Sequence, residues 1–215
     1  MYGFPDETLD NWHHDIDQAL ALGVEHLSAY ALMYEEGTPL YGLLQQGRVK
    51  EVDEELSLQM YSDLIDRLQA ASYEHYEVSN FAKPGYRSRH NGNYWNQTPY
   101  IGLGAAAHSY NGTDCRRWNV ADIRQYIEGI EQGRSACEQE HLDSDTRYND
   151  LVMTALRTCE GLDLAHLSAV HRDYSRAQSQ RFVDDGLLVE RDSHLRLTRR
   201  GLFVSNMIMG ELMKV

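Results

Sequence analysis

The sequence predicts an α/β protein in its first half, followed by a mainly helical domain with a winged-helix-like end. Helical and strand patterns alternate over residues 1–79, which is the rhythm of α/β structure. Beyond about residue 111 the apolar periodicity becomes mainly helical, and it closes with a hairpin and a last helix. We therefore expect one domain at residues 1–110 and a second at residues 111–215.

Two helices and two strands account for most of the first domain. Either Asp6 or Thr8 can cap a helix whose apolar positions recur every three or four residues. Residues 26–33 have the composition of a mostly buried strand, and residues 56–68 form a second amphipathic helix. Another short strand is expected at residues 76–79. In structure of this class the strands are typically parallel, and functional residues collect at their carboxyl ends.

A long polar segment follows. Residues 80–99 contain few aliphatic side chains and many Gly, Asn, Arg and aromatic residues, so we expect a loop of functional length. Residues 100–108, Tyr-Ile-Gly-Leu-Gly-Ala-Ala-Ala-His, carry small side chains that let a ligand or another stretch of backbone approach closely. The glycines at 102 and 104 lack the third glycine of a dinucleotide-binding fingerprint. From the residues alone, a ligand contact and tight strand packing are equally favoured here.

The second domain is expected to consist of helices and one hairpin. A helix near its end, residues 175–181, has the place of a DNA-recognition helix, but Asp184 and Asp185 follow it directly, so a packing role is favoured. The expected elements are helices near residues 120–127, 148–156, 164–170 and 175–185, strands at 187–190 and 195–197, and a last helix capped by Thr198.

Composition excludes several classes of function. The formal net charge of −13 argues against general affinity for nucleic acid or anionic membrane, which requires clustered Lys and Arg. The sequence has neither an apolar run long enough to span a membrane nor a secretory signal. Cys115, Cys137 and Cys159 are sparse, odd in number and widely spaced, which is typical of a reducing compartment and matches no metal-cluster motif. We therefore expect a cytoplasmic protein.

The strongest candidate for a ligand site is the hexapeptide His-Asn-Gly-Asn-Tyr-Trp at residues 90–95. Imidazole can ligate haem iron, and aromatic faces can stack on a porphyrin ring. Arg87 or Arg89 could pair with propionate groups. A structural interpretation is also open, in which Tyr94 and Trp95 anchor the loop and the other side chains bond its backbone. From the residues alone, the structural interpretation is favoured.

Several motifs carry a family resemblance. In the first half of the chain they are Met-Tyr-Gly-Phe-Pro at residues 1–5 followed by Glu7-Thr8, His-Leu-Ser-Ala-Tyr at 26–30, Tyr-Glu-Val-Ser-Asn-Phe-Ala at 76–82, the hexapeptide at 90–95, and residues 100–109. The match extends into the second half at Arg117, Asn119, residues 186–188, residues 195–198 and Gly201. In these motifs the chain resembles HemW-type proteins, the haem-chaperone branch of the oxygen-independent coproporphyrinogen III oxidase-like radical S-adenosylmethionine (SAM) family. The His-Asn-x-x-Tyr-Trp element resembles the chaperones and not the oxidases.

This resemblance implies a more specific fold and site. Residues 1–110 would be the last part of a partial (β/α)₆ radical-SAM barrel, and residues 111–215 a HemN-like C-terminal domain. The family's Cys-x-x-x-Cys-x-x-Cys loop, which binds a [4Fe–4S] cluster, is not in this sequence, so we expect a truncated piece of a longer protein. By resemblance, the haem-binding residues are His90, Asn91, Tyr94 and Trp95, with His90 as axial ligand, and the SAM-binding residues are Met33, Gly102, Gly104, Ala105, Ala107 and His108.

The functional expectation is a haem chaperone that delivers haem to acceptor proteins. SAM and the cluster would belong to the full-length parent only, and this chain would hold no metal-ligand set and no catalytic residue. One alternative is a coproporphyrinogen III oxidase that decarboxylates its substrate by radical chemistry. Another is a folded interaction domain that binds no haem. Haem or porphyrin and haem-acceptor proteins are the expected partners, nucleic acid is not, and a homodimer and weak membrane association through partners are left open.

Overall fold

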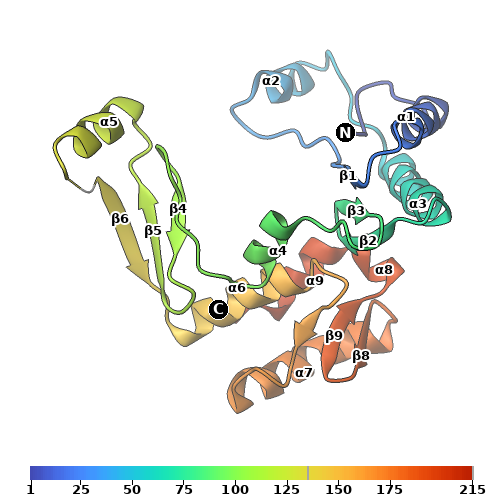
Figure 1. The fold of residues 1–215 in the computed structure, drawn as a ribbon. Helices are drawn as coiled ribbons and strands as arrows, with labels where there is room; N and C mark the ends of the chain where they lie inside the picture. Colours follow the sequence, from blue (N-terminus) through green and yellow to red (C-terminus); the bar gives the residue numbers. More distant parts are fainter. Residues whose placement is uncertain (135, 215) are drawn as a thin grey trace. The chain divides into compact units, whose positions relative to one another are not determined.

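The computed structural model describes residues 1–134 and 136–214, and its contacts divide the chain into two compact units, Met1–Ser88 and Arg89–Val215 (Figure 1). The mixed α/β class expected from the sequence is confirmed. The domain boundary expected between residues 110 and 111 stays a prediction, as do the partial barrel and the winged-helix-like end.

The first unit is a small antiparallel sheet with helices. Its sheet has the strand order β1-β3-β2, and α1 packs against α3. The elements are α1 (Leu9–Ala21), β1 (His26–Ser28), α2 (Pro39–Gln45), α3 (Glu54–Ala70), β2 (Glu74–Glu77) and β3 (Asn80–Ala82).

Local sequence explains where α1 begins and which face it buries. The Thr8 side chain accepts a hydrogen bond from the Asn11 N–H, and the Asn11 side chain accepts one from the Thr8 N–H, which forms a capping box. Trp12 and Ile16 form the buried face, and the Trp12 indole donates to the Met60 carbonyl of α3 at 2.8 Å. The helices predicted near these positions are confirmed.

The expectation of neighbouring parallel strands is wrong in this unit. The strands β1 and β2 run in the same direction, but β3 lies between them and is antiparallel to both. Residues 78–79 turn the chain back on itself, so residues 80–82, expected to begin a loop, form a buried central strand in which Phe81 and Ala82 are 0% exposed. The strand expected at residues 26–33 ends at Ser28, and α2, which was not among the expected elements, begins at Pro39 with Thr38 as its cap.

The second unit contains two further antiparallel sheets. One has the order β4-β5-β6 and carries α5 between its last two strands, and the other has the order β7-β9-β8 and packs with helices (Figure 1). The elements are α4 (Arg89–Trp95), β4 (His108–Tyr110), β5 (Cys115–Asn119), α5 (Ile123–Glu131), β6 (Cys137–His141), α6 (Ser144–Ala155), β7 (Leu162–Asp163), α7 (Ala169–Asp184), β8 (Leu188–Arg191), β9 (His194–Leu197), α8 (Arg199–Leu202) and α9 (Ser205–Leu212).

The hydrophobic core of this unit joins α6, α7 and α9 to the β7-β9-β8 sheet. Its fully buried members are aliphatic residues that converge from elements distant in sequence. They include Val152, Leu162, Leu164, Leu195, Ile208, Met209 and Leu212, each 0% exposed. The predicted β8–β9 hairpin is confirmed, and its turn residues Asp192 and Ser193 have φ values of 53° and 60°, as a type I′ turn requires.

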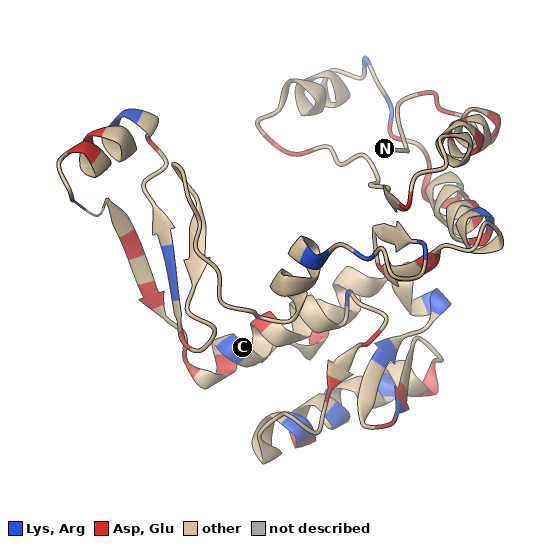
Figure 2. Ribbon diagram, in the orientation of Figure 1, with Lys and Arg blue, Asp and Glu red and all other residues tan. Residues whose placement is uncertain are grey.

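Several expectations for the second unit need correction. The strands β5 and β6 were not among the expected elements, and their residues lack an alternating apolar pattern. An antiparallel ladder of residue pairs from Cys115–His141 to Asn119–Cys137 joins them, and the Arg116 guanidinium on β5 lies 2.7 Å from the Glu140 carboxylate on β6. Figure 2 shows basic residues on β5 and acidic residues on β6. The two short helices expected near residues 164–185 are one helix, α7, and the single last helix is interrupted between α8 and α9.

A pair of glycine substitutions tests the packing of the β7-β9-β8 sheet. Both Gly161 (φ 74°) and Gly186 (φ 69°) have left-handed backbone, which costs a non-glycine residue roughly 1–2 kcal/mol. A Cβ at Gly161 would lie 2.3 Å from the Leu195 carbonyl oxygen, whereas one at Gly186 would meet nothing closer than 3.7 Å. We expect Gly161→Ala to destabilise the unit by about 1–3 kcal/mol more than Gly186→Ala in urea unfolding. Equal losses for the two variants would contradict this packing.

Candidate functional site

The hexapeptide at residues 90–95 lies on a short helix, α4, and not in a loop as expected. Its residues are weak helix formers, and Gly92 in its interior disfavours a helix further. The helix ends in a Schellman motif, in which the Gln97 N–H donates to the Tyr94 carbonyl at 3.2 Å and the Thr98 N–H to the Asn93 carbonyl at 2.9 Å. Gln97 occupies the left-handed position of this motif with a φ of 52°, where glycine is usual.

His90 and Tyr94 are both exposed and lie one helical turn apart. Their ring centroids are 5.1 Å apart with the rings perpendicular, and Tyr94 contacts Tyr100 in the same edge-to-face manner at 4.8 Å. Tyr100 and Tyr110 exchange two backbone hydrogen bonds of 3.0 Å, and their rings lie 6.4 Å apart. We call His90, Tyr94, Tyr100 and Tyr110 the aromatic row.

Trp95 has a different environment from His90 and Tyr94. It is half-buried, and the Arg157 guanidinium lies over its ring, 5.6 Å from the centroid. The indole Nε1 is fully shielded from solvent and has no hydrogen-bond partner among the described residues. Trp95 therefore anchors α4 to the second unit, where α4 packs on α6. Of the four residues expected to bind haem, His90 and Tyr94 are presented together, Asn91 is half-buried, and Trp95 packs inward.

The residues expected to bind SAM belong to both units. Met33 lies in the first unit and is 71% exposed. Gly102, Gly104, Ala105, Ala107 and His108 lie in the second, where a Cβ at Gly102 would be 2.0 Å from the His108 carbonyl oxygen. The absence of a side chain at Gly102 thus admits another stretch of this chain's own backbone.

Neighbouring groups already bond much of the backbone over residues 102–107. The Gly102 N–H donates to the Ser109 hydroxyl at 3.0 Å, and the Gly104 N–H donates to the Tyr126 hydroxyl at 3.1 Å. The Asn119 amide donates to the Gly104 carbonyl at 2.8 Å. These contacts explain the small residues by packing, and SAM binding at this segment stays a prediction.

The cysteines do not fit an iron–sulfur cluster. Cys115 and Cys137 lie on neighbouring strands, but Cys115 is paired with His141 and Cys137 with Asn119, at opposite ends of the ladder. In the described part of the chain, no group of three or more His, Cys, Asp or Glu side chains could hold a metal ion.

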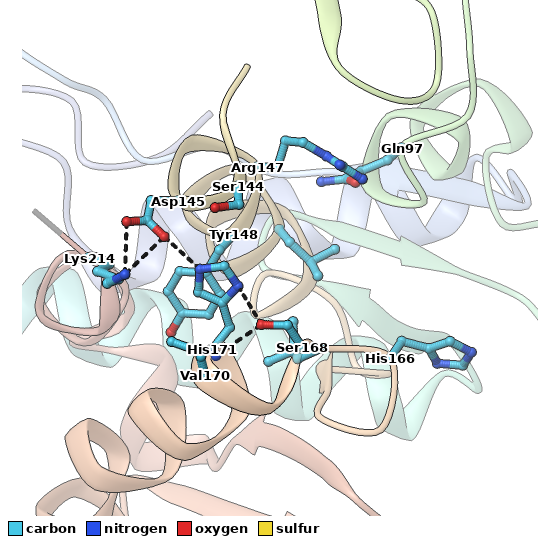
Figure 3. Close-up of a pocket in the computed structure, with 12 residues that line it drawn as sticks. Gln97, Ser144, Asp145, Arg147, Tyr148, His166, Ser168, Val170, His171 and Lys214 are labelled. Carbon is cyan, nitrogen blue, oxygen red and sulfur yellow. Dashed lines mark hydrogen bonds and ion pairs between the residues drawn. The ribbon is translucent and has the colours of Figure 1, made fainter. Parts of the chain in front are cut away.

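A cavity of about 570 Å³ lies in the second unit, between the first turns of α6 and α7 (Figure 3). Inside it, the His171 imidazole is stacked on Tyr148 at 4.8 Å, with Nδ1 3.0 Å from the Ser168 hydroxyl and Nε2 2.7 Å from the Asp145 carboxylate. The Lys214 ammonium lies 2.8 Å from the other Asp145 oxygen. The lining residues are Gln97, Ser144, Asp145, Arg147, Tyr148, Leu151, His166, Leu167, Ser168, Val170, His171 and Lys214.

Sequence reasoning did not find this cavity. The spacing of Ser168 and His171 is that of a helix cap, and Ser168 does cap α7 by accepting from the His171 N–H. The other lining residues come from the segment after α4, the start of α6, the residues on either side of Ser168 and the end of the chain, so no local pattern connects the whole set. Only the folded arrangement brings Gln97 and Arg147 to the same cavity.

Comparison with known proteins decides the family. Residues 142–204 match the model of the HemN C-terminal domain family. The heme chaperone HemW of Bacillus subtilis is 32% identical over 98% of this chain and 56% of its own length, and that of Mycobacterium tuberculosis is 35% identical over 99% and 54%. The resemblance to HemW-type proteins is confirmed. The chain spans about half the length of these HemW relatives.

A solved structure supports the fold. Coproporphyrinogen III oxidase HemN from Escherichia coli, described as a radical SAM enzyme, matches 99% of this chain and 53% of its own with a TM-score of 0.74. At 18% identity, this likeness to HemN shows the mixed α/β fold alone. Within the described residues, none of the helices combines the length and apolar character needed to cross a membrane.

The Asp145 carboxylate predicts a dependence of stability on pH. Hydrogen bonds from Lys214 and then His171 hold the pKa of Asp145 below its ordinary value of 3.8. A lowered folded-state pKa stabilises the fold above the unfolded-state value, and that stabilisation is lost as the pH falls through the folded-state value. We expect wild type to exceed Asp145→Asn in urea midpoint at about pH 6, and the difference to shrink below pH 3.8. A difference that is absent at pH 6, or that persists undiminished in acid, would contradict this role.

Proposed function

We propose that this chain supplies the haem-binding part of a HemW-type haem chaperone. The observation that carries the proposal is the exposed pair of His90 and Tyr94 on α4, within the element that resembles the chaperones. A neutral imidazole is an ordinary axial ligand of haem iron, and aromatic rings beside it can contact the macrocycle. Curated relatives that match nearly all of this chain carry the name heme chaperone.

The exposed position of His90 is better suited to haem that is held for transfer than to haem that stays bound as a cofactor. Its ring is exposed and lies at the end of the aromatic row, so haem bound there would remain open to solvent on one side. An open site allows an acceptor protein to reach the same iron and displace the ligand. We therefore propose that His90 holds haem for transfer, with no bond in the porphyrin made or broken.

The oxidase alternative stays testable on the full-length protein. It predicts that SAM is consumed and that the mass of a porphyrinogen substrate falls, whereas a chaperone leaves its haem unchanged. The fold likeness to HemN does not select between the two functions.

For the full-length protein we also propose a [4Fe–4S] cluster and SAM as cofactors. The proposed SAM-binding residues are Met33, Gly102, Gly104, Ala105, Ala107 and His108. The proposed partners are haem-acceptor proteins, and the proposed compartment is the cytoplasm.

A haem titration followed by absorbance tests the proposal. We expect a saturable shift of the Soret band with wild type. Loss of even an outer partner of a metal ligand costs about 10–100-fold in metal affinity, so loss of the ligand in His90→Ala should weaken binding at least about tenfold. The matched control is His14→Ala, which removes an exposed histidine of α1 in the first unit and should leave binding unchanged.

Two results would count against the proposal. If wild type shows no saturable binding, this chain is not a haem-binding part, and the third alternative, a folded interaction domain, is favoured. If His90→Ala binds haem as wild type does, the site lies elsewhere and α4 loses its assigned role.

A further inference from the structure

Arg147 is a cation with no protein partner in the described residues. It lies in the first turns of α6 and lines the cavity, and its guanidinium makes no hydrogen bond or ion pair with any residue that the structure describes. Arg116 differs, because its guanidinium lies 2.7 Å from Glu140 and 3.0 Å from Asp150. In a chain with a formal net charge of −13, an exposed and unpaired arginine at a cavity is available for an external anion.

The Arg147 charge also acts on Tyr110, the last member of the aromatic row. Burial raises the pKa of Tyr110, and among the charges around that phenol Arg147 opposes the rise most strongly. Tyr110 is joined to Tyr100 by two backbone hydrogen bonds, and Tyr100 contacts Tyr94. The row therefore begins at a histidine that can ligate iron, and its last phenol is within electrostatic range of Arg147. Arg147 also lines the same cavity as Gln97, which ends the helix that carries this histidine.

Gln97 lines the same cavity as Arg147 and has an unfavourable backbone conformation. Its φ of 52° disfavours a non-glycine residue by roughly 1–2 kcal/mol. Residues held in such conformations cluster at ligand sites. Figure 3 shows the Gln97 and Arg147 side chains on the opposite side of the view from the Asp145–Lys214 ion pair.

Two of the acidic groups around this place are paired with cations, and a third, Asp114, is within electrostatic range of Arg147 and accepts hydrogen bonds from Asn111 and Thr113. Asp145 is paired with Lys214 and His171, and Asp150 is paired with Arg116. Lys214 is thereby engaged by the protein, and the cavity's unpaired charge is that of Arg147 within the described residues. Ser168 and His171 are hydrogen-bonded to each other at the start of α7, so these groups require no ligand.

We propose that Arg147, with Gln97, binds the carboxylate side chains of the porphyrin whose ring lies along the aromatic row. This inference rests on the proposed haem-binding function. A guanidinium binds a carboxylate through two parallel hydrogen bonds, which fixes orientation as well as adding affinity. The arrangement orients the macrocycle, with its iron toward His90 and its propionates toward α6, and it selects porphyrins that carry carboxylates.

Titration of this chain with ferric haem and with its dimethyl ester tests the inference. The ester keeps the iron and the ring but lacks the negative charges. Wild type should bind haem more tightly than the ester. Arg147→Gln should weaken haem binding about fivefold, the scale of a partly exposed charged hydrogen bond, and leave ester binding unchanged. Arg124→Gln, at an exposed arginine of α5, makes the same change in charge and should affect neither ligand.

A second variant distinguishes a loss of haem binding from a loss of folding. Gln97→Gly relieves the left-handed strain, so it should raise the urea midpoint while weakening haem binding and sparing the ester. If wild type binds neither ligand, the proposed function fails together with this inference. If wild type binds haem but Arg147→Gln affects haem and ester equally, or affects neither, the inference is overturned and the haem-binding function stands.

Discussion

A helix of two turns does not sustain itself in water, because nucleation leaves too few hydrogen bonds to offset the ordered residues. The helix α4 has seven residues, one of them glycine, so its existence depends on what holds it from outside. Trp95, inserted under the Arg157 guanidinium, and the Schellman motif at Gln97 supply that hold. Everything proposed about haem depends on this anchoring, since it is what presents His90 and Tyr94 together on the exposed side.

The same anchoring connects chemistry that is far apart in sequence. The turn that ends α4 places Gln97 at the cavity beside the start of α6, which Arg147 also lines. The Tyr100–Tyr110 bridge extends the aromatic row to a phenol on which the Arg147 charge acts. An axial ligand, an aromatic surface and an unpaired cation then lie in one unit of the chain. Together they match the three parts of a haem molecule: iron, macrocycle and propionates.

Sequence patterns predicted the elements whose stability is local. The cap at Thr8 and the β8–β9 turn are examples, because neighbouring residues determine them. The strands β5 and β6 were missed because they are rich in polar residues and lack an alternating apolar pattern. The helix α7 appeared divided because its buried face includes the polar residues His171, Ser175 and Ser179. In the proposed site, composition singled out residues 90–95 as a candidate, and the family resemblance assigned haem binding to His90 and Tyr94. The inward position of Trp95 and the role of Arg147 follow from packing, which no local spacing encodes.

The central claim is that α4 presents a haem ligand at one end of a site whose other end is Arg147. The most direct measurement is a crystal structure of this chain with ferric haem, with the iron located by its anomalous scattering. The account predicts the iron within about 2 Å of a His90 ring nitrogen, the usual metal–imidazole distance, with the propionates toward Arg147 and Gln97. An iron position bonded to any other residue, or propionates directed away from α6, would contradict it.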